Sequence, residues 1–526
     1  MDRRTFLKKS GVLALSVSWA PGCGSEATDE PMVASYNYTG PMGPADVFTH
    51  GVASGDPFDT SVVLWTRAKP DVVGDEPIFW EVALDPDFEL RVSAGQEALD
   101  PERDGAFKVI ADGLSAGQTY YYRFWVRGRS SVIGRTRTSG PVDHVRLAVC
   151  SCSNYATGLF VGYRGIARRR DLDAVIHLGD YIYEKQYGPA NRPNQPPYEV
   201  VTLADYRTRY GHYRTDPDLL EAHRQHPFIC VWDDHESANN SYKDGAQNHD
   251  PEDGEGSWQD RRQAATRAWT EWLPVREAAD GRIWRRHAWG NLLDLFMLDT
   301  RLWARAKQVS GGMKEQIADP ERPFLGQDQE KWLHEGLVQG SGRWKVLGQQ
   351  VMIAQLKVNG TALNTDQWDG YEATRDRLFD VIEDQNIEGF VVLTGDIHTS
   401  WASDLTRDSS DPERYNPTTG QGAMGVEFVA PGITAGGFGG GSVVLGELAR
   451  DLNPHIRWVD LVHRGYFVLD VRDSAVQSDW FHYATLQDDA EEKLGASWLS
   501  VYGSGHLTEA DSSAAEKDQQ PDLAPG

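Results

Sequence analysis

Residues 174–184 read AVIHLGDYIYE, a short apolar run that ends in Gly179 and Asp180. The run has the length of a buried strand, and glycine permits a tight turn immediately before the acid. Three other apolar runs, residues 145–151, 228–232 and 391–395, end in polar residues in the same way. Open α/β sheets place their sites at the carboxyl ends of strands, so we expect the four ends to meet. The polar residues that follow the runs are Cys152, Asp180, Asp233, Asp234, His235, Asp396 and His398.

A cluster of this composition needs positive counter-charge. Closely packed carboxylates repel one another unless cations hold them, so the pattern predicts a polynuclear metal site. Asp180 could bridge two cations, and Tyr183 lies about one helical turn further on if a helix begins here. A phenolate would suit a hard trivalent ion such as Fe³⁺. The alternatives are an N-cap role for Asp180 and a packing role for Tyr183.

The densest polar cluster of the chain reads WDDHE. Asp234 is a ligand candidate and His235 a catalytic candidate, because an imidazole beside metals can position phosphate or protonate a leaving oxygen. In an extended chain Asp396 and His398 point to the same face, so both can reach one metal pair. The thiolate of Cys152 would bind a borderline or soft metal, and the alternative is an inert buried thiol.

Three further residues are candidates for contact with the substrate. Asn239 and Asn240 could donate to substrate oxygens or complete a coordination shell, and each could equally cap a turn. Arg301 could form a bidentate contact with phosphate, with a structural salt bridge as the alternative.

From residue 141 to residue 490 the chain alternates between strand-like and helical stretches. This alternation predicts a layered α/β domain. The expected helices cover residues 203–210, 219–226, 260–272, 327–339 and 373–386. Additional strands are expected at residues 292–298, 345–347, 425–429 and 465–471.

Residues 45–140 show short strand-like runs separated by turns, with no catalytic cluster. Within them, Leu114 and a turn precede the run Tyr-Tyr-Tyr-Arg-Phe-Trp-Val that begins at Tyr120. This arrangement looks like the tyrosine corner of fibronectin-type sandwiches. We therefore expect an N-terminal fibronectin-III/Ig-like all-β domain, which would serve as support or lid.

The whole chain has 526 residues and a formal net charge of −26. Its length predicts two domains. The acid excess argues against a nucleic-acid-binding surface, which needs basic residues. An anionic substrate would then need local positive charge, which metal ions would supply. We expect a monomer.

The two ends of the chain have their own signals. Residues 1–23 contain Arg3-Arg4 and a short apolar run, and they resemble a twin-arginine export signal. Residues 20–23 loosely resemble a lipoprotein cleavage box, so lipidation of Cys23 and membrane anchoring stay open. The product would be periplasmic, secreted or lipid-anchored. Residues 24–44 read as a linker, and residues 491–526 as a C-terminal tail whose end is disordered.

Several motifs resemble those of one family. HLGDYIYE, YRTDPDL, WDDHE, LDTR, WDGY and TGDIHTSW appear in order along the chain. They are similar to the signatures of PhoD-type alkaline phosphatases and phosphodiesterases, of the calcineurin-like metallophosphatase superfamily. The resemblance implies a β-sandwich core flanked by helices. Thr434 stands in a glycine-rich loop where the family tends toward Thr-Ser.

The resemblance also implies the cofactors. Fe³⁺ would be held by Cys152, Asp180, Tyr183 and His398. Ca²⁺ would be held by oxygen ligands such as those of Asp180, Asp234 and Asp396, and the number of Ca²⁺ ions stays open.

These observations predict an exported, metal-dependent phosphoesterase. It would hydrolyse phosphomonoesters, phosphodiesters or both with a metal-activated hydroxide. A phospholipase D-like phosphodiesterase is the alternative among enzymes. A non-enzymatic exported binding protein is the alternative of another class.

Overall fold

The computed structural model describes residues 33–188, 191–438 and 442–526. The expected export signal and Cys23 lie outside these residues, as does part of the expected linker. Among the described residues, no helix combines the length and the apolar character needed to cross a membrane.

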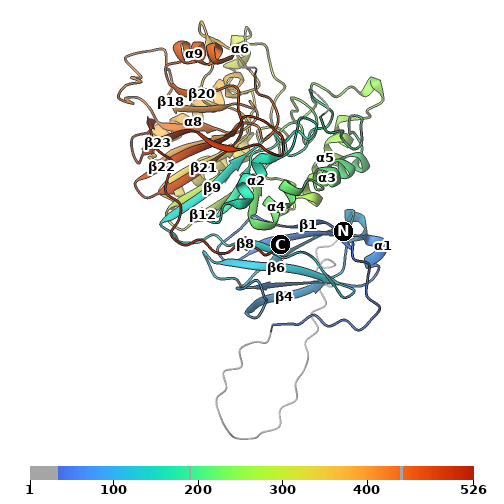
Figure 1. Ribbon diagram of the computed structural model, residues 1–526. Helices are drawn as coiled ribbons and strands as arrows, with labels where there is room; N and C mark the ends of the chain where they lie inside the picture. Colours follow the sequence, from blue (N-terminus) through green and yellow to red (C-terminus); the bar gives the residue numbers. More distant parts are fainter. Residues whose placement is uncertain (1–32, 189–190, 439–441) are drawn as a thin grey trace.

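A ten-stranded mixed sheet forms the larger wall of the molecule (Figure 1). Its three central strands, β9, β10 and β11, run parallel, and His177 on β10 lies opposite both Cys150 and Cys230. The carboxyl ends of these strands therefore meet at one edge. The strand order is β24 (Thr508–Glu509), β23 (Glu492–Val501), β22 (Ala475–Tyr483), β21 (Arg464–Arg472), β9 (His144–Cys150), β10 (Ala174–His177), β11 (Pro227–Cys230), β1 (Phe48–Gly55), β2 (Val62–Ala68) and β5 (Ala106–Ala111).

A seven-stranded sheet forms the second wall. On β13, Leu295 packs in the core shared with the ten-stranded sheet, whereas its neighbour Phe296 packs in a separate core with two helices. This alternation follows the period of two along a strand. The strand order is β12 (Arg285–Trp289), β13 (Leu293–Met297), β14 (Trp344–Gln349), β17 (Phe390–Thr394), β19 (Gly425–Val429), β18 (Ser400–Leu405) and β20 (Ile456–Asp460).

Helices cover the two packed sheets. Leu333 of α7 (Gln327–Gln339) and Leu378 of α8 (Glu372–Asp384) pack on the seven-stranded sheet. The core of the ten-stranded sheet includes residues of four other helices, which lie together in Figure 1. The expected α/β class is confirmed. The four helices are α2 (Val161–Arg168), α3 (Leu203–Tyr213), α4 (Pro217–Gln225) and α5 (Trp258–Trp272).

The N-terminal segment is a two-layer β structure. One layer contains β4 (Arg91–Glu97), β3 (Ile78–Ala83), β6 (Thr119–Val126), β7 (Arg129–Ser130) and β8 (Gly134–Arg137), and the other contains β1, β2 and β5. Trp80 and Phe124 of the first layer share a core with Leu64 and Phe107 of the second. The second layer is not separate from the α/β domain, because β1 pairs in parallel with β11. A single sheet thus crosses the boundary expected at residue 140.

The C-terminal segment differs from the expected tail. β23 pairs along its length with β22, so residues that follow position 490 belong to the ten-stranded sheet. Beyond β24 the chain runs down to the N-terminal domain and ends near β8 (Figure 1). The Arg146 guanidinium donates to the Ala515 carbonyl (2.8 Å), and the Tyr121 hydroxyl donates to the Asp522 carbonyl (2.7 Å). Donors on both domains therefore hold this segment, in place of the separate tail that we expected.

Candidate metal centre

The candidate ligands follow their strands in sharply turned backbone. Cys152, Asp180, Asp396 and His398 have φ values of 60°, 55°, 61° and 60°. This left-handed region is uncommon for residues with a side chain, and such strain gathers at functional sites. Gly179, with φ of 105°, precedes Asp180, and a Cβ there would lie 2.4 Å from the Cβ of Asp233. The turn after β10 therefore requires glycine.

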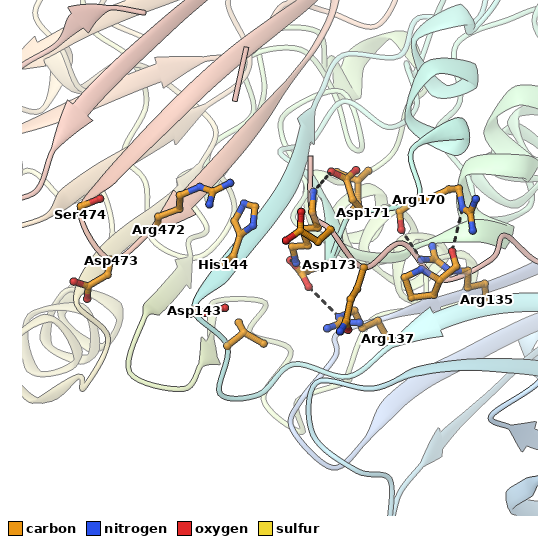
Figure 2. Close-up of a pocket in the computed structure, with 16 residues that line it drawn as sticks. Arg135, Arg137, Asp143, His144, Arg170, Asp171, Asp173, Arg472, Asp473 and Ser474 are labelled. Atoms are coloured by element: carbon orange, nitrogen blue, oxygen red, sulfur yellow. Dashed lines mark hydrogen bonds and ion pairs between the residues drawn. The ribbon is translucent and has the colours of Figure 1, made fainter. Parts of the chain in front are cut away.

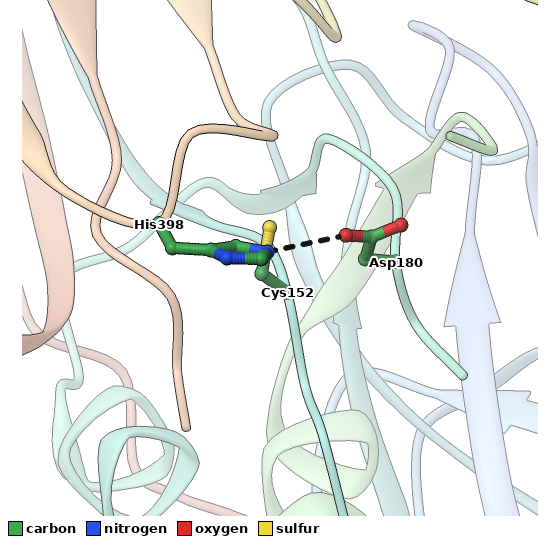
Figure 3. A group of neighbouring side chains, drawn as sticks. All are labelled: Cys152, Asp180 and His398. Atoms are coloured by element: carbon green, nitrogen blue, oxygen red, sulfur yellow. Dashed lines mark ion pairs between the residues drawn. The ribbon is translucent and has the colours of Figure 1, made fainter. Parts of the chain in front are cut away.

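Four side chains from three of these turns converge on one point. Ligand atoms of Cys152, Asp180 and His398 lie within 4.8 Å of one another (Figure 3). The Tyr183 hydroxyl donates to Asp180 Oδ2 (2.9 Å) and lies 3.0 Å from His398 Nε2. Burial, and then the charge of Asp180, raises the pKa of the Tyr183 phenol well above its usual range. A cation would be needed to ionise it.

Several carboxylate side chains lie beside this point. Asp180, Asp234 and His235 form one cluster of possible ligands, and Asp233, Asp234 and Asp396 form another. Burial raises the pKa of Asp396 to about 7. Asp233 Oδ2 is buried and has no hydrogen-bond partner among the described residues. These oxygens are the donors that hard cations take, so the residues fit a second metal beside the first.

Arg301 lies among the carboxylates and is fully buried. Its Nε donates to Asp233 Oδ1 (2.5 Å), and its Nη1 donates to Asp366 Oδ2 (2.7 Å). Its Nη2 donates to Asp396 Oδ1 (2.6 Å). The expected contact with phosphate differs from this arrangement, because each guanidinium nitrogen already faces a carboxylate. The alternative, a structural ion pair, describes what the structure shows.

His235 is held by a buried acid. His235 Nδ1 lies 2.7 Å from Glu184 Oε2, and the ring packs on Tyr183 with centroids 4.3 Å apart. The Tyr187 hydroxyl donates to Glu184 Oε1 (2.6 Å). Burial lowers the pKa of His235, but the carboxylates of Glu184, Asp234 and Asp180 outweigh it and raise the pKa well above its usual value. These carboxylates therefore favour the protonated form of the imidazole.

Glu236 joins two of the turns. Its carboxylate accepts the backbone N–H groups of Asp180 (2.9 Å), Tyr181 (2.7 Å) and Asp233 (2.8 Å). The turns after β10 and β11 are thereby held against each other. We did not predict roles for Glu184 and Glu236 from the sequence. Both stand within the quoted motifs, which was the available signal, but spacing alone does not show where a side chain points.

The two asparagines lie at the rim of the centre. The side-chain amides of Asn239 and Asn240 both donate to Gln247 Oε1, at 3.0 and 2.8 Å. Their backbone N–H groups donate inward, to Glu184 Oε1 (3.1 Å) and Asp234 Oδ2 (2.6 Å) respectively. Both residues thus brace the site through the main chain.

Thr434 is buried and holds a neighbouring loop. Its hydroxyl donates to the Asn154 carbonyl (2.7 Å). The adjacent Ala435 N–H donates to the Cys152 carbonyl (3.1 Å). The glycine-rich loop around Thr434 is therefore fastened directly to the turn that carries Cys152.

A cavity of about 800 Å³ lies elsewhere, between the N-terminal domain, the start of β9 and the C-terminal segment (Figure 2). Its charged residues neutralise one another, as in the ion pair between Arg137 and Asp173 (2.9 Å). It contains none of the clustered metal-ligand candidates. We therefore place the chemistry at the carboxylate centre and not in this cavity.

Comparisons with known proteins show which family the chain resembles. A family model described as PhoD-like phosphatase matches residues 147–480, and one described as its N-terminal domain matches residues 37–140. Alkaline phosphatase D of Bacillus subtilis (strain 168) is 35% identical over 514 residues, which cover 91% of this chain and 83% of the relative. A solved structure of PhoD matches with a TM-score of 0.79 and 32% identity, covering 91% of this chain and 94% of that one.

The fold, the centre and these similarities together define a phosphoric ester hydrolase. The chain belongs to the PhoD-like phosphatase family. The alternative of a non-enzymatic binding protein is therefore wrong.

Proposed function

We propose that this phosphatase is metal-dependent and that its centre holds Fe³⁺ and Ca²⁺. The convergence of the Tyr183 hydroxyl, Asp180 and His398 beside Cys152 carries the proposal, because a phenolate and a carboxylate suit a hard trivalent ion. The Fe³⁺ ligands would be Cys152, Asp180, Tyr183 and His398. The Ca²⁺ ligands would include oxygens of Asp180, Asp234 and Asp396.

The bound ions would supply positive charge for the phosphoryl oxygens and lower the pKa of an attacking water. The residues of the chain divide the remaining work. His235 would donate a proton to the leaving oxygen, and Glu184 fixes its orientation through Nδ1. Arg301 and Glu236 would keep the carboxylates in place without touching the substrate. Asn239 and Asn240 would position substrate from the rim.

The substrate would be a phosphomonoester, a phosphodiester or both. The assay would measure hydrolysis of both kinds of ester by three preparations of the enzyme: as isolated, after chelation, and after reloading with Fe³⁺ and Ca²⁺. We expect hydrolysis to be lost on chelation and to return on reloading. Full hydrolysis by enzyme shown to be free of metal would contradict the proposal.

A diester with a lipid group is the second candidate substrate. Helix α9 (Val443–Leu452) leaves Val443, Val444 and Leu445 more than half exposed. The preceding loop contains Gly436, which lies against His398 of the centre. Val444→Asp should therefore slow hydrolysis of phosphatidylcholine vesicles and leave a soluble diester unaffected. Equal activity of the variant on both substrates would remove this candidate.

The remaining features of the proposal concern the whole chain. We propose export by the twin-arginine route through residues 1–23, with a monomeric product. The N-terminal domain would be a fibronectin-like support. The hydrogen bond from the Ser115 N–H to the Tyr120 hydroxyl (2.8 Å) supports this, since a tyrosine corner has that contact. Detection of the mature protein outside the cytoplasm, and its loss on replacing Arg3 and Arg4 by Lys, would test the route.

A further inference from the structure

A second group of metal-ligating side chains lies outside the centre described above. Asp460 ends β20, His463 follows in the next turn, and His482 lies on β22. One ligand atom from each lies within 4.8 Å of the other two. His463 Nδ1 is 2.8 Å from Asp460 Oδ2, and the rings of His463 and His482 are stacked with centroids 5.2 Å apart.

The backbone holds this group in place. Asp460 Oδ1 accepts the N–H groups of Val462 (2.8 Å) and His463 (2.9 Å), which closes the turn and leaves Oδ2 to face the His463 ring. His482 Nε2 lies 3.1 Å from the hydroxyl of Ser400, and Ser400 is the register partner of Asp460. The Nε2 edge of the buried imidazole therefore faces the strand pair that carries Asp460.

We propose that Asp460, His463 and His482 form a second metal site that takes Zn²⁺ or a similar divalent transition-metal ion. Two imidazoles and one carboxylate are ligands that such ions prefer, whereas Ca²⁺ takes oxygen ligands. The side chain of His463 is 42% exposed, so an ion can enter from solvent and keep a position for water.

A metal ion at this site would stabilise a turn that contacts the catalytic region. Arg464, which follows His463, donates to the Gly436 carbonyl. Position 436 requires glycine, because a Cβ there would lie 2.1 Å from the Cβ of His398. An ion at the second site would therefore fix the turn that holds this glycine loop beside His398, and Zn²⁺ should raise the melting temperature.

The test uses the enzyme loaded with its own metals and then dialysed against Zn²⁺, with metal analysis of the protein. His463→Ala removes an exposed ligand and should preserve the fold, as should Asp460→Asn. His144→Ala is the control, because His144 Nε2 also faces a carboxylate, that of Asp470 at 2.7 Å, but belongs to none of the three-ligand groups of the described residues.

We expect wild type and His144→Ala to bind one more equivalent of Zn²⁺ than His463→Ala. Affinity at this site should fall at least about tenfold in both ligand variants. The fine structure of the zinc X-ray absorption spectrum of the wild type should show two imidazole ligands. Equal Zn²⁺ content in wild type and His463→Ala, or an equal loss in His144→Ala, would overturn the proposal.

Discussion

The Tyr183 hydroxyl donates a 2.9 Å hydrogen bond to Asp180 Oδ2 although the residues between them are not helical. The left-handed conformation of Asp180 turns the chain back and brings the phenol over the carboxylate. The helix that we considered after Asp180 is therefore absent, and a strained turn produces the same proximity.

Replacing Tyr183 with Phe tests the phenol as a ligand. A phenolate bound to Fe³⁺ absorbs visible light, so the iron-loaded wild type should be coloured and Tyr183→Phe should lose that absorption. Activity should fall roughly 10–100-fold. Tyr187→Phe is a matched control for the absorption, since the hydroxyl of Tyr187 bonds to Glu184. A colourless wild type with full iron content would exclude the phenolate ligand.

Replacing Glu184 with Gln tests the orientation of His235. The neutral amide removes the nearest charge that raises the pKa of His235, so kcat should fall about 10²-fold or more. KM and metal content should change little, as measured by steady-state kinetics and metal analysis. Glu271→Gln, at a buried carboxylate that pairs with Arg207, is the control. A full kcat in Glu184→Gln would show that His235 needs no partner.

Replacing Glu236 with Ala tests whether this carboxylate holds two turns together. Three backbone N–H groups would lose a buried acceptor, at a cost of about 1–3 kcal/mol each before relaxation. Metal content and melting temperature should both fall. An unchanged metal content with a lowered melting temperature would show that Glu236 stabilises the fold and does not support metal binding.

Removal of metal should make stability depend on pH. Burial raises the pKa of Asp396 to about 7 and that of Glu236 to about 8. Acids with raised pKa values stabilise the fold at low pH, and this stability is lost as the pH rises from about 4 through those values. Between about pH 5 and pH 8 these two acids should therefore oppose the stability that the fold gains with rising pH from buried histidines with lowered pKa values, such as His177 and His226. Added metal should raise the melting temperature more at the higher pH, and calorimetry showing equal shifts would contradict this.

Deleting residues 511–526 tests the C-terminal segment as a clasp between domains. Ala524 is buried against Tyr121 of the N-terminal domain, and its N–H donates to Gln225 Oε1 (2.8 Å) of α4. Loss of these and neighbouring hydrogen bonds should lower the free energy of unfolding by roughly 2–4 kcal/mol, measured in urea. Deletion of Gly526 alone should have little effect, since this residue is exposed. Equal stability of all three proteins would show that the segment is not a clasp.

Local patterns predicted much of the fold. The expected elements at residues 327–339 and 425–429 coincide with α7 and β19. Long-range pairing was missed, as in the parallel contact between β1 and β11, because register between distant strands leaves no local signal. β23 was missed as well, since its polar residues hide the strand.

The candidate site, like the fold, was predicted only in part from the sequence. Strand ends identified the clustered Cys152, Asp180, Asp234 and His398. The first three follow the parallel strands β9, β10 and β11 of one sheet, and His398 follows β17 of the other sheet. The role of Arg301 depends on the side chains that surround it in space. Four carboxylates lie around its guanidinium, so it forms structural ion pairs. Such surroundings follow from the packed fold and cannot be obtained from spacing.

The most direct test is a crystal structure of enzyme purified with its metals, with anomalous data collected on both sides of the iron absorption edge. The account predicts an iron peak between Cys152 Sγ, Asp180, the Tyr183 hydroxyl and His398 Nε2, with a lighter cation near Asp234 and Asp396. Fully active crystals with no iron peak among these four residues would contradict it.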